Sequence, residues 1–302
     1  MKAYYADHFV LPLPEGHRFP MAKYRMLRDL VERMPGLQLE EAPKASIEEL
    51  LLAHEASYVE KVIHGQLSPA EQREIGFPWS KQMVERSQRS AGATIAACIS
   101  AYHEGVSANL AGGTHHAYAN KGSGFCVFND AAIAARATQK FLYPILGRKA
   151  RIAIIDLDVH QGNGTASILQ GDSSIFTFSI HGEKNFPFRK EASDLDIGLV
   201  DGVSDEHYLH ALERGLIELE QLFDADFLIY LAGADPHEGD RLGRLKLTHE
   251  GLHQRDEMVF SWGALRHLPI AITMAGGYGV DIANTVSVHA QTIQTAIRYA
   301  WL

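Results

Sequence analysis

The chain has 302 residues, of which 46% are hydrophobic and 22% are charged, as is ordinary for a globular protein. Its 28 Lys and Arg face 37 Asp and Glu, and the resulting net charge of −9 argues against direct nucleic-acid binding, which needs clustered basic residues. The two cysteines, Cys98 and Cys126, cannot build a disulfide framework, so we expect a reducing, cytoplasmic compartment. No signal-peptide pattern and no apolar window of about 18 residues is present, so no membrane association is expected.

The N-terminal third is expected to be mostly helical. Ser46 and Glu49 have the spacing of a capping box and predict a helix over Leu50 to Ile63. A further helix is predicted from Ser80 to Tyr102, with small residues on one face. Because no repeat and no Gly-, Ser- or Pro-rich linker divides the chain, we expect one domain over residues 1–302.

Beyond residue 102, short apolar runs alternate with helical segments of about 15–20 residues. The runs are rich in Ile, Val, Leu and Phe and alternate only weakly: Asn109–Ala111, Ile152–Leu157, Ile175–Ile180, Phe227–Ala232 and Ile270–Ala275. Strands buried on both faces have this character, which is typical of a parallel sheet between two helical layers. The predicted fold class is therefore α/β, a single three-layer α/β/α domain around a central, mostly parallel sheet.

Each of these runs leads into glycine or a polar group capable of chemistry. The five following segments are G-G-T-H-H, D-V-H-Q-G-N-G, His181, G-A-D-P-H-E-G-D and G-G-Y-G. In open parallel sheets, ligands bind beyond the carboxyl ends of the strands. We therefore expect an active site at this edge of the sheet.

A divalent metal site is predicted at this edge. Asp156, Asp158 and His160 are spaced i, i+2, i+4, and in extended chain all three side chains point to one side. Alone, they could be polar caps with an ion-paired histidine. Asp235, at another strand end, favours their interpretation as part of a metal site. Asp158, His160 and Asp235 supply two carboxylates and one imidazole and leave a position open for water and substrate.

Other side chains at these strand ends are candidates for catalysis. Next to a metal, His115 and His116 become candidate general bases and acids. The hydroxyl of Tyr278 could stabilise an oxyanion, although a packed ring is the alternative. Phe125 and Phe186 belong either to the core or to the wall of an apolar channel, and Cys126 is interpreted as packing rather than as a nucleophile.

The motifs together resemble the histone deacetylase family, which has the arginase/deacetylase fold. The stretches that carry the resemblance are H-R-F-P-M-A-K-Y (17–24), G-G-T-H-H-A (112–117), G-F-C-V-F-N-D (124–130), I-D-L-D-V-H-Q-G-N-G (155–164), F-S-I-H (178–181), G-A-D-P-H-E-G-D-R-L-G (233–243) and G-G-Y (276–278). The H-Q-G-N-G form and the compact length are closest in style to class IV and bacterial deacetylase-like proteins.

The resemblance implies a role for each matching residue. One zinc ion would be held by Asp158, His160 and Asp235. The catalytic group would comprise His115 paired with Asp156, His116 beside the attacking water, Asn163, and Tyr278 at the amide carbonyl. The channel for the acyl chain would be lined by Gly124, Phe125 and Phe186. A structural K⁺ site would draw largely on backbone oxygens of Asp156, Asp158, His160, Ser179 and Ile180. Asn163 stands where class I members have Asp, as it does in other active classes.

The implied activity is zinc-dependent removal of acetyl or longer acyl groups from acyl-lysine or a similar acylated amine. Acetylpolyamines and other small amides are alternative substrates, and loops 65–80 and 182–193 are expected to decide between them. A binuclear-manganese ureohydrolase fits less well, because Gln161-Gly162 follow His160 where a second metal would need Asp. A non-catalytic scaffold is a further alternative. The choice between Zn²⁺ and Fe²⁺, the pathway and the oligomeric state stay open.

Overall fold

The computed structural model describes residues 1–301. Its strands are β1 (Lys2–Tyr5), β2 (Gln38–Glu41), β3 (Val106–Asn109), β4 (Ile152–Asp156), β5 (Ile175–Gly182), β6 (Leu195–Leu199), β7 (Phe227–Leu231) and β8 (Ile270–Thr273). Its helices are α1 (Ala22–Val31), α2 (Ile47–Leu50), α3 (Ala56–His64), α4 (Pro69–Ile75), α5 (Lys81–Glu104), α6 (Asp130–Leu146), α7 (Asn163–Leu169), α8 (Asp205–Leu222), α9 (His249–Leu265) and α10 (Ile282–Ile297).

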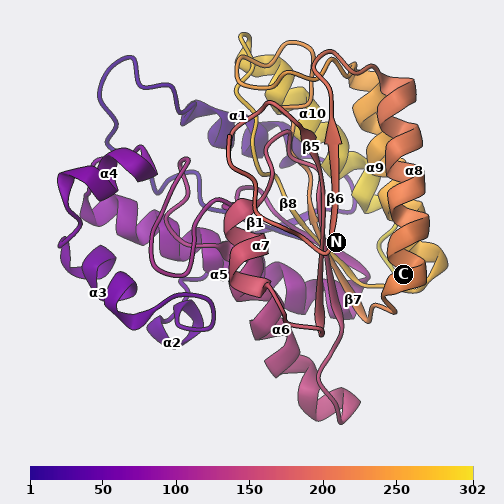
Figure 1. Ribbon diagram of the computed structural model, residues 1–302, viewed down its shortest axis with the longest axis horizontal. Helices are drawn as coiled ribbons and strands as arrows, with labels where there is room; N and C mark the ends of the chain where they lie inside the picture. Colours follow the sequence, from indigo (N-terminus) through magenta and orange to yellow (C-terminus); the bar gives the residue numbers. More distant parts are fainter. Residues whose placement is uncertain (302) are drawn as a thin grey trace.

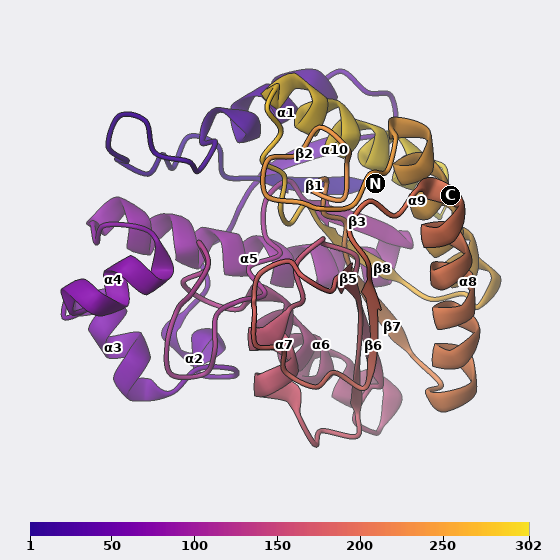
Figure 2. The ribbon, with the colours of Figure 1, turned by 45° about the horizontal axis from the view of Figure 1, so that its top comes forward.

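The strands form one sheet in the order β2-β1-β3-β8-β7-β4-β5-β6, and every neighbouring pair is parallel. Successive residues of β4 enter different cores: Ile154 packs in the core with α5 and α6, whereas Ile155 packs in the core with α1, α8, α9 and α10. Figures 1 and 2 show the sheet between these two helical layers, with α2, α3 and α4 extending beyond α5. The predicted three-layer α/β/α fold is confirmed.

The strands that the sequence analysis did not predict are β1, β2 and β6. β2 and β6 are the edge strands, and their residues are half-buried or alternate between buried and exposed, so they lack the apolar run of a central strand. The predicted strand Asn109–Ala111 is wrong in its bounds, because β3 ends at Asn109. The V-S-A-N sequence of β3 carries little apolar signal, although all four residues are buried.

The predicted helix over Leu50 to Ile63 is also wrong, because α2 ends at Leu50 and α3 begins only at Ala56. The capping box of Ser46 and Glu49 is present, but it begins a helix of 4 residues. The prediction from Ser80 to Tyr102 is confirmed: Ser80 caps α5, and its side chain accepts a hydrogen bond from the backbone N–H of Met83.

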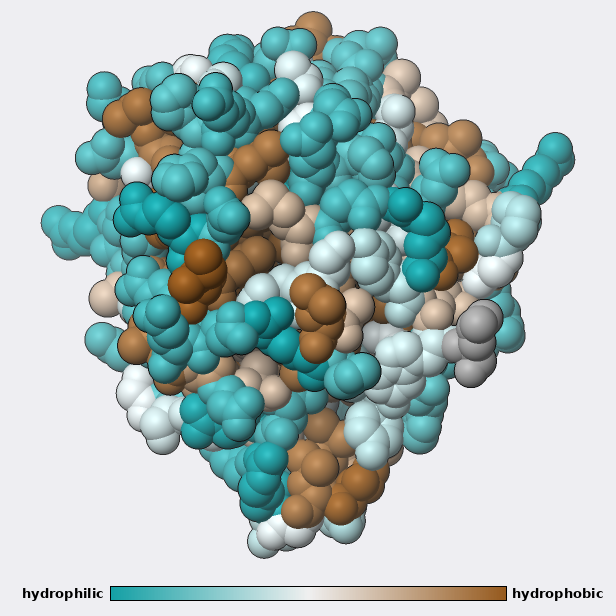
Figure 3. All heavy atoms as spheres, turned by 90° about the vertical axis from the view of Figure 1, so that its right-hand side faces the viewer, coloured by the Kyte–Doolittle hydropathy of each residue, from teal (hydrophilic) through white to brown (hydrophobic). Residues whose placement is uncertain are grey.

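Because all strands are parallel, their carboxyl ends meet at one edge of the sheet. β4, between β7 and β5, ends in Asp156, which lies in register with Leu231 of β7 and Ser179 of β5. The segments after β3, β4, β7 and β8 therefore converge there. On the face over α8 and α9, hydrophilic side chains predominate, with hydrophobic ones in small groups between them (Figure 3). Within residues 1–301, no helix has the length and apolar character needed to cross a bilayer.

Candidate active site

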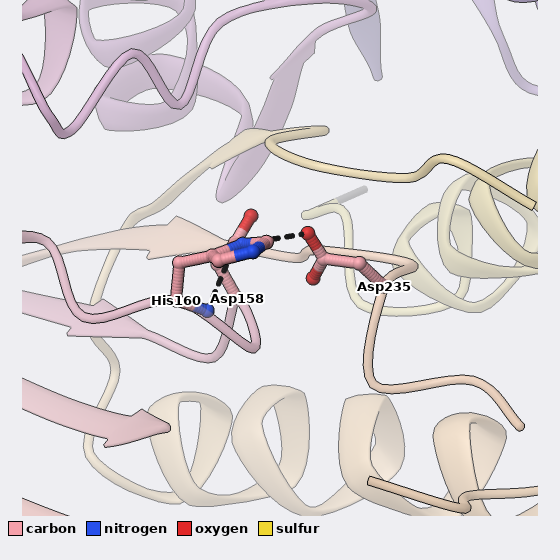
Figure 4. A group of neighbouring side chains, drawn as sticks. All are labelled: Asp158, His160 and Asp235. Atoms are coloured by element: carbon pink, nitrogen blue, oxygen red, sulfur yellow. Dashed lines mark hydrogen bonds and ion pairs between the residues drawn. The ribbon is translucent and has the colours of Figure 1, made fainter. Parts of the chain in front are cut away.

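Three buried side chains form a cluster of metal-ligand type at this edge. Potential ligand atoms of Asp158, His160 and Asp235 all lie within 4.8 Å of one another. Nδ1 of His160 lies 2.9 Å from Oδ1 of Asp158 and 3.3 Å from Oδ2 of Asp235. Figure 4 shows the imidazole facing both carboxylates. Within the described residues, this is the one group of three or more such side chains that could hold a metal ion.

A loop, rather than extended strand, brings Asp158 and His160 together. β4 ends at Asp156, and the next turn is held by the N–H of Asp158, which donates to Oδ1 of Asp156, and by the N–H of His160, which donates to Oδ1 of Asp158. The prediction that an extended strand places all three side chains on one side is therefore wrong, because the strand ends before Asp158 and His160. Asp156 turns instead toward His115.

The cluster has free space and an available carboxylate oxygen for a cation. Backbone N–H groups of Val159 and Gly276 donate to Oδ1 of Asp235 and Oδ2 of Asp158, at 2.9 and 2.7 Å. Within residues 1–301, the buried Oδ2 of Asp235 accepts no hydrogen bond, and Nδ1 of His160 lies 3.3 Å from it. A Cβ atom on Gly276 would collide with the carboxylates of Asp158 and Asp235, so only glycine keeps this space free. Two carboxylates, one imidazole and an unsatisfied buried oxygen fit a divalent ion.

The charges of the cluster favour a cation as well. Burial raises the pKa of Asp235 to about 7, and the negative charge of Asp158 adds to that effect. Burial would lower the pKa of His160, but its two carboxylate neighbours outweigh it and raise that pKa to about 10. An imidazolium therefore balances the acids in the metal-free chain. A metal ion would displace its proton, as metal binding to histidine generally does.

Two adjacent histidines beside the cluster have different partners. Nδ1 of His115 lies 2.6 Å from Oδ2 of Asp156, and Nδ1 of His116 lies 2.7 Å from Oδ1 of Asn163. Burial opposes the charge on His115, but Asp156 and Asp158 outweigh it and raise the pKa to about 9. Burial and the nearby imidazoles of His115 and His160 hold the pKa of His116 well below its ordinary value. At neutral pH, His115 is therefore charged and His116 is neutral.

The metal cluster and the histidines open into a cavity of about 680 Å³. Its walls include the predicted channel residues Gly124, Phe125 and Phe186, together with Tyr278. The ring of Phe186 meets His116 edge-on, with centroids 4.9 Å apart, and the ring of Phe125 lies 6.0 Å from that of Tyr278. The predicted residues Asp156, Asn163 and Asp235 do not line the cavity, but each contacts a histidine that does. Burial raises the pKa of the Cys126 thiol, which makes it a poor nucleophile.

Comparison with known proteins identifies the family. A model described as histone deacetylase domain matches residues 17–293. The chain belongs to the histone deacetylase family. An uncharacterised protein of Picosynechococcus sp. is 43% identical to it over 289 residues, which are 95% of each chain. Histone deacetylase 2 of Arabidopsis thaliana is 32% identical over 219 residues, which are 72% of this chain and 53% of that protein.

The fold is also that of solved relatives. A crystal structure of a histone deacetylase homologue from Aquifex aeolicus superposes with a TM-score of 0.81 at 23% identity, over 98% of this chain and 83% of that one. At this identity the likeness concerns the fold. This deacetylase-family chain therefore combines the family's fold with a buried Asp–His–Asp metal site.

The turn that carries the two histidines of this deacetylase-family chain depends on Asp130, a residue that the sequence analysis did not single out. Its carboxylate accepts hydrogen bonds from the N–H groups of Gly113 and Thr114, at 3.0 and 2.7 Å. Gly113 has a φ of 71° and lies so close to Ala275 that a side chain would collide. The only sequence signal for Asp130 is its place at the end of the G-F-C-V-F-N-D motif.

Further residues of the deacetylase site were also missed. Asp240 accepts a hydrogen bond from the N–H of Tyr278 at 2.6 Å and so orients that residue. Lys23 is 2% exposed, lines the cavity, and lies 3.3 Å from the carbonyl of Gly277. Tyr118 contacts Asn163 from a loop. Lys23 and Asp240 lie within the motifs 17–24 and 233–243, but the partner of each of the three residues is far along the chain, so no local pattern marks the contact.

Ser179 and Ile180, predicted for the K⁺ site of this family, are buried in β5 beside the metal loop. Ser179 pairs in register with Asp156, and its hydroxyl lies 2.9 Å from Nδ1 of His181. The predicted group is therefore contiguous at the end of β4 and β5, and the K⁺ ion itself stays a prediction.

Proposed function

We propose that this deacetylase-family chain is a zinc-dependent amidohydrolase that removes acetyl or longer acyl groups from acyl-lysine. One observation carries the proposal: a buried Asp–His–Asp cluster and two histidines, one paired with a carboxylate and the other with an amide, meet in one cavity with aromatic walls. Hydrolysis of an amide needs an activated water, a proton acceptor and a stabilised oxyanion. The cavity supplies a candidate for each.

Asp158, His160 and Asp235 would hold one Zn²⁺ per chain. The bound ion would polarise the amide carbonyl and lower the pKa of water. The single cluster also disfavours the binuclear ureohydrolase alternative, because Asp156 is taken up by His115. Metal analysis of protein expressed without added metal distinguishes Zn²⁺ from Fe²⁺. The K⁺ site would comprise Asp156, Asp158, His160, Ser179 and Ile180 and would be structural.

His116 is the proposed general base. Oδ1 of Asn163 can only accept a hydrogen bond, so Nδ1 of His116 carries the proton and Nε2 is left as the basic nitrogen. Nε2 takes a proton from the attacking water and delivers one to the amine nitrogen as the C–N bond breaks, so that amide and water become amine and carboxylate. His115, held charged by Asp156, stabilises negative charge that develops nearby.

Tyr278 is the proposed oxyanion donor. Burial raises the pKa of its hydroxyl well above the ordinary value, so the group stays protonated and can donate to the carbonyl oxygen. Phe125 and Phe186 would flank the acyl chain, and Gly124 would keep the passage open, since a Cβ there would meet His116 and Phe186.

The charge at the cavity mouth bears on the substrate. The exposed charged side chains in the lining are Arg18, Lys184, Arg244 and Glu74. Arg244 is paired with Asp201 at 3.1 Å and Glu74 with Lys121 at 2.7 Å, whereas Arg18 and Lys184 make no ion pair within residues 1–301. A basic rim repels polycations and attracts acidic groups. We therefore place acyl-lysine within a peptide, with neutral or acidic neighbours, ahead of acetylpolyamines.

A substrate panel tests this proposal. Purified protein is assayed against acetyl-lysine peptides with acidic or basic flanks, myristoyl-lysine peptides and acetylpolyamines. We expect turnover of the peptides, with acidic flanks preferred, and loss of turnover in the metal-stripped protein and in His116→Ala. Preference for acetylpolyamines would overturn the substrate assignment. No turnover of any amide by the metal-loaded protein would favour a scaffold.

A further inference from the structure

A chain of hydrogen bonds leads from His116 to the molecular surface. Oδ1 of Asn163 faces Nδ1 of His116 at 2.7 Å, and Nδ2 of Asn163 donates to the hydroxyl of Tyr118 at 2.9 Å. That hydroxyl donates to Oε1 of Glu191 at 3.1 Å. Tyr118 and Glu191 are both half-buried, and burial together with Glu191 raises the pKa of Tyr118 to about 12. Its hydroxyl therefore holds a single proton at neutral pH.

The direction of each hydrogen bond follows from the last group in the chain. The carboxylate of Glu191 can only accept, so it takes the one proton of the Tyr118 hydroxyl. Because its one proton is used, that hydroxyl can only accept a hydrogen bond from Asn163. The NH₂ of the Asn163 amide therefore faces Tyr118, and the amide oxygen faces His116. The flipped amide would leave two acceptors competing for one tyrosine proton and would point its NH₂ at His116, which would force the imidazole proton onto Nε2.

We propose that Tyr118 and Glu191 are positioning residues that fix the orientation of the Asn163 amide and thereby hold the proton of His116 on Nδ1. The inference rests on the proposed function, because only a base whose Nε2 is free can accept a proton from water. Neither residue reaches the substrate. They act through Asn163, by disfavouring the Nε2–H tautomer of His116, in which Nε2 cannot accept a proton from water.

The position of Glu191 is itself tied to the metal loop. Gln161, which follows the ligand His160 and is 1% exposed, accepts from the N–H of Glu191 at 2.9 Å and donates to its carbonyl at 2.7 Å. Gln161 also donates to Asp196 at 2.8 Å. Gln161 and Asn163 of the Q-G-N segment thus hold the two ends of the same hydrogen-bonded chain.

The experiment measures the tautomer directly. ¹⁵N-histidine-labelled protein, metal-free and zinc-loaded, is studied by long-range ¹H–¹⁵N correlation at neutral pH, and the His116 signals are assigned with His116→Gln. We expect the Nδ1–H tautomer in the parent and an increased Nε2–H fraction in Tyr118→Phe and in Glu191→Gln. The glutamine at position 191 can donate to Tyr118 and so permits the amide to flip. An unchanged tautomer in both variants would overturn the proposal.

Glu183→Gln is the matched control. It removes the same charge from the same loop, and within residues 1–301 the Glu183 side chain makes no hydrogen bond or ion pair. Its tautomer and activity should equal those of the parent. Loss of one net hydrogen bond corresponds to about a fivefold shift, so the ratio of Nδ1–H to Nε2–H in Glu191→Gln should fall about fivefold, and kcat should fall in proportion to the Nδ1–H fraction that is measured, with KM unchanged. If the tautomer of His116 shifts in the two variants but the parent hydrolyses no amide, the proposed function is wrong, and the positioning role of Tyr118 and Glu191 is still supported.

Discussion

Two neighbouring histidines show how far a single contact determines chemistry. The rings of His115 and His116 lie 4.1 Å apart and are both buried, yet one is charged and the other neutral. Burial opposes charge on both rings, but at His115 the carboxylates of Asp156 and Asp158 outweigh it, whereas at His116 the neighbouring imidazoles add to it. A pair of titratable groups whose environments separate their pKa values is the usual basis for dividing acid and base roles.

Loss of Asp235 should abolish metal binding. Asp235→Ala removes the buried oxygen that has no other partner and one of the two carboxylates of the cluster. Loss of a residue that only hydrogen-bonds to a metal ligand lowers metal affinity by up to about 100-fold. Because Asp235 is a proposed ligand, we expect a larger fall, measured by competition with a chromophoric chelator. Asp226→Ala, which removes a half-buried partner of Arg148 just before β7, should keep full affinity. Unchanged affinity in Asp235→Ala would refute the ligand set.

Tyr278→Phe tests the proposed oxyanion donor. If the hydroxyl contributes only as charge develops on the carbonyl oxygen, kcat should fall by about 100-fold or more, while KM changes little. Steady-state kinetics on an acetyl-lysine peptide measure both. Tyr24→Phe is the control, because Tyr24 lines the same cavity. An effect confined to KM would assign Tyr278 to substrate positioning instead.

At the scale of elements, the break between α2 and α3 serves the active-site loop. His54 lies in that break, and its Nδ1 lies 3.0 Å from the carbonyl of Tyr118 while its Nε2 accepts from the N–H of Asn129 at 2.8 Å. The first contact requires a proton on Nδ1 and the second requires a lone pair on Nε2, so His54 must be neutral. The helical lobe of α2, α3 and α4 is thereby joined to the segment between His116 and α6.

This contact makes stability depend on pH. Burial lowers the pKa of His54 from 6.5 to about 4. Between these values the unfolded chain binds the proton that the folded chain excludes, so the free energy of unfolding falls as pH drops below 6.5 and levels off below 4. The loss attributable to His54 is up to about 3 kcal/mol. Denaturant titrations from pH 7 to 4 measure it.

His54→Gln should flatten that pH dependence, because it removes the titrating group. His64→Gln, at the exposed end of α3, serves as the comparison and should leave the slope as it is. Identical slopes for the parent and His54→Gln would show that His54 is not held neutral.

For the whole molecule, the metal is expected to contribute to folding. Three buried carboxylates, those of Asp156, Asp158 and Asp235, gather at one sheet edge. A ligand at 100 times its Kd stabilises the folded state by about 2.7 kcal/mol, which should correspond to a Tm shift of roughly 4 °C for a chain of this length. Calorimetry of the zinc-loaded and chelator-treated protein measures the shift, and Asp235→Ala should respond to neither treatment. Equal Tm values for the loaded and stripped parent would contradict a bound ion.

Residues next to one another in the sequence were enough to predict the central sheet and the ligand candidates. The runs at Ile152 and Phe227 are apolar because both faces of those strands are buried, and the glycines and acids that follow them mark the strand ends. Parallel pairing then places those ends at one edge, whatever the details of the loops. The metal ligands Asp158, His160 and Asp235 follow from these local features.

Only the tertiary structure decided which groups meet across that edge. β1, β2 and β6 give weak patterns because part of each strand stays in contact with solvent, whereas the central strands are buried throughout. Tyr118 and Glu191 are 73 residues apart, and nothing near either one marks the other as its partner. The orientation of the Asn163 amide, and with it the tautomer of His116, depends on the contact between Tyr118 and Glu191. The reason is that the direction of each hydrogen bond is set by the complete chain of donors and acceptors and by no residue alone.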